Sequence, residues 1–360
     1  MQADHWTRTA SMRGHVAVRA DEAALPGLFE SSEQEGVDAK VREHQSSISN
    51  IELTDHSIQR LNVSGRSLDD RIIAMSIDEP VGAGFQYREL EIPGAEMHFV
   101  GFTGFDYEDH TDLYLVNNKP FIDLTTRKLL DPTDKGANTT IEHIRVNTEA
   151  ETVTVVGTFS DPHITTPNNI ATKGDSSFYF TNDHGPHKLG YRHHLSPFLK
   201  DGEIGYCNEG GCRQVESGIG FPNGLSFGAD GLLYVPSSFQ GDVRVYRPQQ
   251  DGGLEQIDTI PLSYPLDNLS LDADGDIWVP GLPDIQQTLD GFANPLDVTP
   301  PASVFRIKKG QDGYQVDKVL EDGEGEILPA ATTVVHDVKT GRLFISGVFS
   351  PFISVCEPKK

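Results

Sequence analysis

Basic residues are scarce in this chain of 360 amino acids. It has 29 Lys and Arg against 54 Asp and Glu, so its formal net charge at pH 7 is −25. A surface of that sign repels phosphate backbones, which argues against nucleic acid as a partner and against an anionic membrane surface. No run approaches 18 apolar residues, so the sequence predicts no membrane span.

Cysteine is also rare, with three residues in the whole chain. Cys207 and Cys212 enclose a short Asn-Glu-Gly-Gly loop, which is compatible either with a hairpin disulfide or with a pair of thiols. Cys356 stands alone near the end of the chain. The cysteine spacing matches no zinc site.

The amino-terminal residues are polar and lack the apolar core of an intact signal peptide. We expect residues 1–35 to form a flexible or extended segment and residues 36–360 to form one folded domain. Glycosylation acceptor tripeptides begin at three asparagines: Asn62, Asn138 and Asn268. These tripeptides favour a secretory or extracellular location, with a cytoplasmic one as the alternative.

Short β-prone runs recur behind Gly or polar turn residues at intervals of about 40 to 66 residues. Six of them begin at these positions: Asp70, Asp112, Ser177, Gly231, Asp276 and Gly341. No window has the pattern of a long amphipathic helix. Strand repeats of this period are typical of propeller blades, and six blades of about 60 residues account for the whole chain. The sequence therefore predicts an all-β fold, a single six-bladed β-propeller with a central tunnel.

One segment, Gly185–Glu203, breaks the strand pattern, and we expect it to form a lid over one end of the propeller. In three successive repeats, polar residues head the strand before the turn, starting at Asn168, Asn223 and Asp267. Because the first strand of each blade lines the propeller axis, equivalent positions would converge there. Their oxygens suit a hard cation such as calcium. The alternative is that Asn and Asp simply begin strands after turns.

These segments also resemble a known family. Phe178–His184 (Phe-Tyr-Phe-Thr-Asn-Asp-His), Gly220–Gly224 and Pro265–Ser270 are similar to the corresponding strings of paraoxonase/arylesterase propellers. The resemblance runs from about Asp70 to Cys356. It implies a six-bladed propeller with two calcium ions in its tunnel that hydrolyses lactones and esters. One calcium would polarise the carbonyl, while a pair of histidines activates water.

The resemblance carries over to individual positions only in part. Four residues match the ligands of the family's catalytic calcium: Asn168, Asn223, Asp267 and Asn268. His98 falls at the first catalytic histidine, but Asn118 replaces the second, and Asn118 cannot accept a proton near neutral pH. A two-histidine relay would therefore be lost.

The deeper, structural calcium lacks its carboxylates in this sequence. Asn169 replaces one aspartate of that site, and the nearest match to the family's Glu-Asp pair in the first blade is Ser49-Asn50. Calcium affinity depends on the number of anionic ligands. We therefore expect the deeper calcium to be absent and the upper one to be weak or absent.

This degenerate site favours a non-hydrolytic enzyme of secondary metabolism that needs no cofactor. Its tunnel would hold hydrophobic small molecules in a near-attack geometry, with His98 and Asn118 as the wall and the amides and Asp267 as the polar floor. Related strictosidine-synthase-like propellers and metal-free fungal propellers suggest a hetero-Diels–Alder cyclase that joins a quinone methide to an alkene, as in tropolone sesquiterpenoids. The alternatives are a calcium-dependent lactonase or arylesterase and a non-catalytic binding propeller. The sequence leaves the oligomeric state open.

Overall fold

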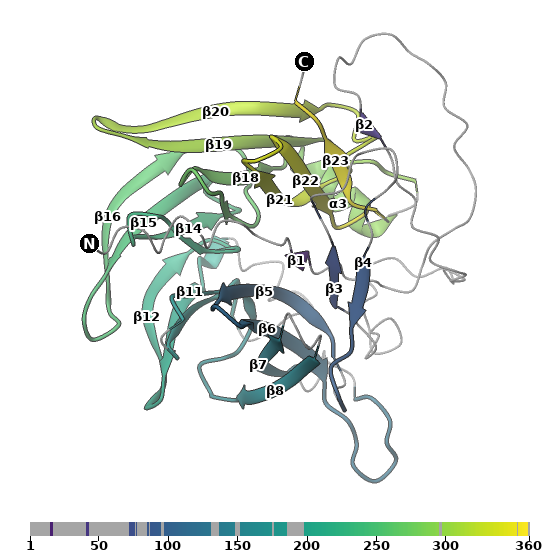
Figure 1. The fold of residues 1–360 in the computed structure, drawn as a ribbon, viewed down its shortest axis with the longest axis vertical. Helices are drawn as coiled ribbons and strands as arrows, with labels where there is room; N and C mark the ends of the chain where they lie inside the picture. Colours follow the sequence, from purple (N-terminus) through teal and green to yellow (C-terminus); the bar gives the residue numbers. More distant parts are fainter. Residues whose placement is uncertain are drawn as a thin grey trace. The chain divides into compact units, whose positions relative to one another are not determined.

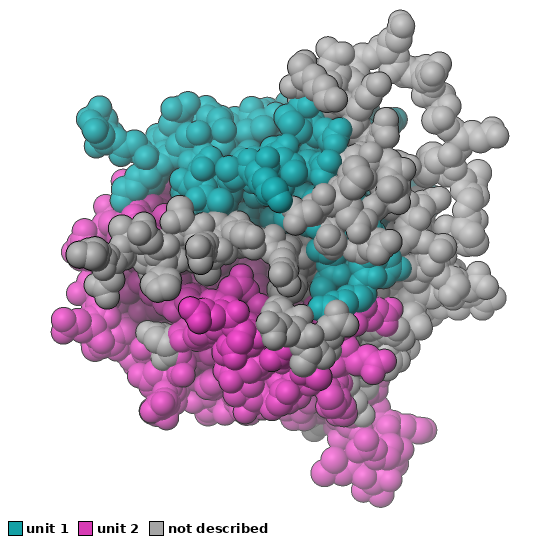
Figure 2. All heavy atoms as spheres, in the orientation of Figure 1, with its two compact units in different colours: residues 1–60, 73–88, 270–360 teal, residues 61–72, 89–269 magenta. Residues whose placement is uncertain are grey.

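The computed structural model describes residues 15–16, 41–42, 72–75, 77, 85, 87–94, 97–130, 137–147, 152–174, 176–185, 198–294, 297–350 and 352–358. Ser49, Asn50 and most of the predicted amino-terminal segment lie outside these ranges. The chain divides into two compact units, which Figure 2 colours separately. Unit 1 comprises residues 1–60, 73–88 and 270–360, and unit 2 comprises residues 61–72 and 89–269.

Unit 2 contains, among its described residues, three antiparallel four-stranded sheets, each made of strands that follow one another in the chain (Figure 1). The first sheet is β5 (Phe99–Asp106), β6 (His110–Pro120), β7 (Ala137–Asn147) and β8 (Thr152–Phe159). The second is β9 (Pro167–Thr172), β10 (Phe178–Asn182), β11 (Gly202–Asn208) and β12 (Gly211–Ile219). The third is β13 (Ser226–Phe227), β14 (Leu233–Ser237), β15 (Asp242–Pro248) and β16 (Leu254–Pro261).

Unit 1 holds two further four-stranded sheets among the residues described. One is β17 (Ser270–Leu271), β18 (Ile277–Gly281), β19 (Ala302–Gly310) and β20 (Gly313–Asp322). The other pairs an early strand with the last strands of the chain, in the order β2 (Val41–Arg42), β23 (Ser354–Cys356), β22 (Arg342–Gly347) and β21 (Ala331–Asp337). A three-stranded sheet has the order β1 (His15–Val16), β3 (Ile72–Met75) and β4 (Tyr87–Leu90).

These sheets confirm the predicted fold class, because the protein is mostly β and its sheets are propeller blades. Each of the six predicted runs falls on one strand of a different sheet: β3, β6, β10, β14, β18 and β22. One helix was not predicted, α3 (Ile285–Ala293), whose first turn is capped by the Asp284 carboxylate. No helix in the described part of the chain is long and apolar enough to cross a membrane.

The predicted lid needs a correction at its carboxyl end. Gly202 and Glu203 belong to β11, where Glu203 pairs with Asn182 of β10. The side chains of these two residues are also joined, because Asn182 Nδ2 donates to Glu203 Oε1 at 2.7 Å. Residues 186–197 lie outside the described part of the chain, so the lid stays a prediction.

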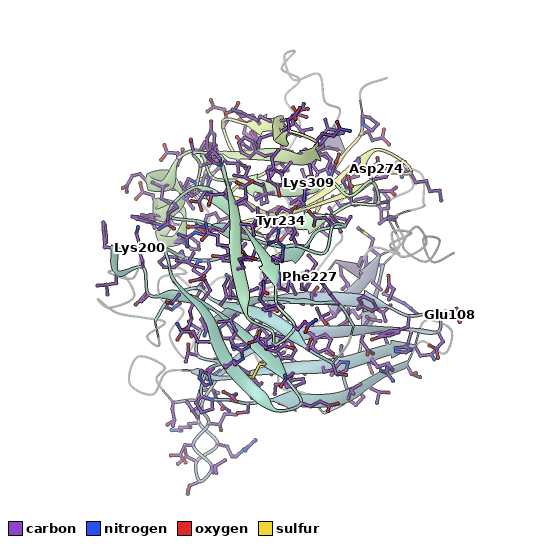
Figure 3. The ribbon with its side chains drawn as sticks, turned by 90° about the vertical axis from the view of Figure 1, so that its left-hand side faces the viewer. Glu108, Lys200, Phe227, Tyr234, Asp274 and Lys309 are labelled. Atoms are coloured by element: carbon purple, nitrogen blue, oxygen red, sulfur yellow. A yellow bond between two sulfur atoms is a disulfide. The ribbon has the colours of Figure 1, made fainter. Side chains whose placement is uncertain are left out.

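In three sheets, the second strand along the chain forms the core. All residues of β10, β14 and β18 are buried. Tyr114 and Phe178 pack in one cluster of unit 2, and Tyr179 and Tyr246 pack in the next. Tyr234 on β14, labelled in Figure 3, donates its hydroxyl to Asp230 Oδ2 at 2.8 Å and so keeps its polar end satisfied. Continuous apolar runs can form these strands because the strands are covered on both faces.

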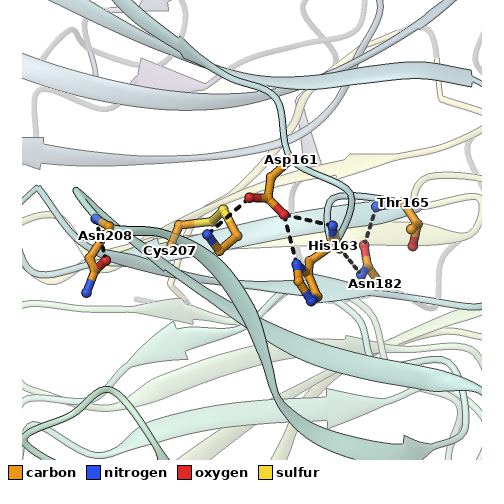
Figure 4. Close-up of a disulfide and its surroundings, with 8 residues drawn as sticks. Asp161, His163, Thr165, Asn182, Cys207 and Asn208 are labelled. Atoms are coloured by element: carbon orange, nitrogen blue, oxygen red, sulfur yellow. Dashed lines mark hydrogen bonds and ion pairs between the residues drawn. A yellow bond between two sulfur atoms is a disulfide. The ribbon is translucent and has the colours of Figure 1, made fainter.

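A disulfide joins Cys207 and Cys212 across the β11–β12 hairpin, which settles the choice that the sequence left open (Figure 4). Asp161 contacts the same hairpin, because its Oδ2 accepts a hydrogen bond from the Cys212 backbone N–H at 3.2 Å. Its Oδ1 accepts from the backbone N–H of His163 at 2.9 Å. Cys356 is a buried free thiol on β23, and burial raises its pKa to about 11.

The packing between strands of one sheet can be tested at Gly205. A Cβ at this position on β11 would lie 2.1 Å from Cζ of the buried Phe180 ring, so the ring would have to move. We expect Gly205→Ala to lower the free energy of unfolding by about 1–3 kcal/mol in chemical denaturation. Gly157→Ala on β8 is the matched control, because nothing lies within 4 Å of a Cβ there. Equal losses in the two variants would contradict the packing.

Candidate functional site

The beginnings of several first strands lie together in unit 2. A Cβ on Gly101 of β5 would be 2.2 Å from the backbone oxygen of Asn168 on β9. A Cβ on Gly224, just before β13, would be 2.1 Å from Asn268 Oδ1 and 2.7 Å from Asn169 Nδ2. Glycine at both positions therefore permits an approach that any side chain would block.

Side-chain hydrogen bonds join these segments. Asn169 Nδ2 donates to Asn268 Oδ1 at 3.0 Å, and Asn268 Nδ2 donates to Asp267 Oδ1 at 2.8 Å. Asn223 also forms a side-chain hydrogen bond with Asp267. Ser238 fixes this arrangement, because its Oγ accepts from Asn223 Nδ2 at 3.1 Å and donates to the backbone of the residue before Asp267 at 2.6 Å. We call Asn168, Asn169, Asn223, Asp267 and Asn268 the amide cluster. Asn223 and Asn268 form hydrogen bonds with its one carboxylate.

Asn168 differs from the other amides of the cluster. Its Oδ1 is buried and accepts no hydrogen bond from any residue that the structure describes. A buried polar atom left unsatisfied costs about 1–3 kcal/mol, and such atoms are usually satisfied by a water or an ion. The Asn168 oxygen is therefore available as a ligand.

Asp267 carries the negative charge of the amide cluster. The residue is partly exposed, but burial of its carboxyl group disfavours the charged form. Burial and, to a smaller extent, the nearby charge of Asp183 raise the pKa of Asp267 to about 7, against hydrogen bonds from Asn268 and Asn223. Without a cation nearby, this carboxyl group is therefore about half protonated at neutral pH.

His98, just before β5, lies next to Asn118 of β6. The Asn118 N–H donates to the His98 backbone oxygen at 2.7 Å, and the His98 N–H donates to Asn117 Oδ1 at 2.9 Å. Thr139 Oγ1 donates to Asn118 Oδ1 at 2.9 Å. Both predicted wall residues are buried, and Gly101, which contacts Asn168, follows three positions after His98.

Sequence reasoning did not include Asp183 and His184 among the site residues. His184 is 4% exposed, and its Nδ1 lies against Asp183 Oδ1. The imidazole stacks on Phe221 with 5.7 Å between ring centroids. Thr166, on the segment leading to Asn168, donates its hydroxyl to the His184 backbone oxygen. The Asp-His dipeptide at the end of a family-like string was the signal that could have identified the pair.

The backbone of Phe221 is strained. Its φ of 51° places a bulky residue in the left-handed region, which costs roughly 1–2 kcal/mol. Two backbone hydrogen bonds hold the turn, from Ser238 N–H to Phe221 O at 2.9 Å and from Phe239 N–H to Gly220 O at 3.3 Å. The strained turn keeps an aromatic ring against His184.

The donor set suits one hard cation better than two. The Asp267 carboxylate and the unsatisfied Asn168 Oδ1 offer oxygens and one charge for a single ion. Asn223 Oδ1 and Asn268 Oδ1 accept from the Gly224 N–H at 2.7 Å and from Asn169 Nδ2 at 3.0 Å, so each would have to exchange that hydrogen bond to bind the ion. At the predicted deeper site the fit is poor, because Asn169 Oδ1 accepts from the Ile170 N–H at 2.8 Å and its Nδ2 is a donor. No group of three or more His, Cys, Asp or Glu in the described ranges is arranged to hold a metal.

The amide cluster also bears on glycosylation. Asn268 Nδ2, the atom that would carry a glycan, donates to Asp267, so a glycan there is incompatible with the cluster. Asn138 lies on β7 with its side chain partly exposed, and Asn62 lies outside the described residues. Use of either acceptor stays a prediction.

Replacing Asp267 should change how stability depends on pH. In the unfolded chain an aspartate titrates near 3.9, well below the folded value of about 7. The folded state therefore holds this proton more tightly, and the resulting stabilisation is full below about pH 4 and is lost as pH rises through 7. In EDTA, we expect the melting temperature of the wild type to fall relative to Asp267→Asn by about 3 °C from pH 4 to pH 8. A constant difference between the two melting curves would contradict a raised pKa.

Comparison with known proteins gives consistent results. The family model described as "Arylesterase" matches residues 129–356, which is more than half of the chain. Mouse serum paraoxonase/arylesterase 1 is 26% identical over 271 residues, 72% of this chain and 70% of that protein. Human serum paraoxonase/arylesterase 2 is 26% identical over 51% of each chain.

Among solved structures, virginiamycin B lyase from Staphylococcus aureus is similar with a TM-score of 0.41 and 12% identity, over 80% of this chain and 88% of that one. That likeness is too low to argue from. The family model carries the assignment, and it spans every strand from β7 to β23. The chain belongs to the arylesterase family.

Proposed function

We propose that this protein hydrolyses carboxylic esters or lactones with the help of one calcium ion held by the amide cluster. The observation that carries the proposal is the Asp267 carboxylate, which is hydrogen-bonded by Asn223 and Asn268, in a cluster in which Asn168 Oδ1 is buried and unsatisfied. The family supports it, because the relatives reported above are named paraoxonases and arylesterases. Their names suggest aryl esters as a substrate class for this chain too.

Asn168, Asn223, Asp267 and Asn268 would hold the ion. When bound, calcium supplies a positive charge that polarises an ester carbonyl and favours the negative oxygen that develops during hydrolysis. Asp267 contributes the charge of the site, and it must lose its proton to do so. The other three residues contribute neutral oxygens, so the affinity should be lower than in sites with several carboxylates.

The substrate carbonyl would lie beside the amide cluster, within reach of the wall formed by His98 and Asn118. Asn118 cannot accept a proton, so water would have to be activated by an imidazole group, that of His98 or His184. His98 and Asn118 are buried, and a low dielectric on that side would strengthen the interaction between the carbonyl and charged groups. The apolar part of the substrate suits a protein whose net charge of −25 disfavours anionic ligands.

The sequence alone favoured cycloaddition over hydrolysis, and the comparisons reverse that order. None of the relatives reported above is named for a cyclase. The same amides that suggested a metal-free pocket include Asn268, which is hydrogen-bonded to Asn169 and to the Asp267 carboxylate, the one charged oxygen ligand of the cluster. Hydrolysis, the first alternative from the sequence, is therefore the function we propose.

Calcium dependence is the test of this proposal. We expect the protein in 1 mM calcium, a concentration on the order of that used by weak protein sites, to hydrolyse phenyl acetate or a simple lactone. EDTA should abolish turnover, and added calcium should restore it. Hydrolysis that persists in EDTA would contradict the calcium site, and no turnover of any aryl ester or lactone by the calcium-loaded protein would contradict the function.

Asp267→Asn should weaken calcium binding by at least about tenfold in calorimetric titration, because it removes the charged ligand. Asp258→Asn removes the same charge from an exposed position on β16 and is the matched control. Similar calcium affinities of the two variants would contradict the role of Asp267.

A further inference from the structure

Asp183 and His184 lie at the end of β10, between two segments of the amide cluster. On one side, Thr181 Oγ1 donates to the backbone oxygen of Asn223 at 3.2 Å. On the other side, the Asp183 N–H donates to the oxygen of Thr166 at 3.2 Å, two residues before Asn168. The charge of Asp183 also reaches Asp267, whose pKa it helps to raise. The pair therefore belongs to the neighbourhood of the proposed calcium ion.

The segment before the pair is held rigidly by Asn182. Its Oδ1 accepts from the backbone N–H groups of Thr165 and Thr166 at 3.3 and 3.0 Å. Its Nδ2 donates to Glu203 Oε1 at 2.7 Å and to the His163 backbone oxygen at 2.8 Å. A buried amide that uses both ends of its side chain in this way fixes the direction in which Asp183 leaves the strand.

The imidazole of His184 is oriented on two sides. Its Nδ1 faces the Asp183 carboxylate, and one face of its ring lies on Phe221, whose strained turn holds it there. A carboxylate partner keeps the proton of a neutral imidazole on Nδ1, so that Nε2 is the basic nitrogen. Three further carboxylates lie around the pair among the residues described: Asp267, Glu203 through Asn182, and Asp201, whose Oδ2 would lie 2.6 Å from a Cβ on Gly185.

We propose that His184, oriented by Asp183, is the general base of this protein's ester or lactone hydrolysis, in place of the His98 that sequence comparison indicates. The inference rests on the function proposed above. It supplies a proton acceptor to a site in which Asn118 occupies the second histidine position. Asp183 acts as a positioning residue, because it contacts the imidazole and not the substrate.

The proton transfers balance without any further reactant. His184 Nε2 takes a proton from water while the water oxygen bonds to the carbonyl carbon and the carbonyl electron pair moves to its oxygen. The carbonyl then re-forms, the bond to the leaving alcohol or phenol oxygen breaks, and that oxygen takes the proton from Nε2. An ester gives an acid and an alcohol, and a lactone gives a hydroxy acid. Asp183 stabilises the imidazolium between the two transfers.

The test compares three substitutions in the calcium-loaded full-length protein, with phenyl acetate as substrate: His184→Gln, His98→Gln and His163→Gln. We expect His184→Gln to lower kcat at least about 100-fold, the usual contribution of a general base, and to remove the acidic limb of the pH profile. His163→Gln should leave activity unchanged. It is the matched control, because His163 also pairs through Nδ1 with an aspartate, Asp161, at 2.8 Å, but is exposed.

A structural role for His184 would be distinguished by two further measurements. Calcium affinity of His184→Gln in calorimetry should stay within about threefold of wild type, since His184 is not a ligand. Free imidazole should restore part of the activity of His184→Gly, because it supplies the missing proton acceptor. Asp183→Asn should lower kcat with little change in KM, because it alters the orientation of the base and not substrate binding.

Two results would overturn the proposal while leaving hydrolysis intact. The first is a His98→Gln variant that loses the acidic limb while His184→Gln keeps it. The second is a His184→Gly variant that folds, binds calcium and regains nothing with imidazole. If His184→Gln does not fold, the kcat of Asp183→Asn is the test. An unchanged kcat in that variant would also overturn the proposal that His184 is the general base. A wild-type protein that hydrolyses nothing would instead overturn the proposed function itself.

Discussion

One carboxylate, Asp267, lies where polar groups from neighbouring strand beginnings meet, and the proposed chemistry depends on it. Burial and the charge of Asp183 raise its pKa to about 7, so a metal-free site spends part of its time neutral at physiological pH. Its partners are amides, which contribute oxygens but no charge. A cation bound beside Asp267 would compete directly with that proton, and calcium binding should therefore strengthen as pH rises through 7.

The segment that carries this carboxylate, between β16 and β17, is fixed by close approach to neighbouring segments of unit 2. Gly101 and Gly224 leave space for the backbone of Asn168 and the side chain of Asn268, and Ser238 bridges Asn223 to the segment that carries Asp267. Strands β10 and β14, in which every residue is buried, form the core of the two sheets next to these segments. Precise placement of neutral ligands matters more here than in a site with many charges, because each amide oxygen contributes less binding energy.

The repeats were predictable from sequence because each one is a local pattern, with a turn residue followed by an apolar run such as Leu232–Val235. The neighbourhood of His184 was not, because it depends on Phe221, Thr166 and Asn182, residues brought together by the fold. The helix α3 was not predicted for a different reason. It has only nine residues, which is too short for a clear helical periodicity in the sequence. The sequence could predict that Asn223, Asp267 and Asn268 lie together, because polar residues head successive strands, but it could not predict the direction of their hydrogen bonds. Their role as calcium ligands, with Asn168, stays a prediction.

The most direct measurement is a crystal structure of the protein grown in calcium, with the ion located by its anomalous scattering. A calcium-assisted hydrolase should show one ion at about 2.3–2.6 Å from Asn168 Oδ1 and from a carboxylate oxygen of Asp267. The deeper position beside Asn169 should be empty. A structure in saturating calcium that shows no ion near Asp267, with Asn168 Oδ1 satisfied by water alone, would contradict the central claim.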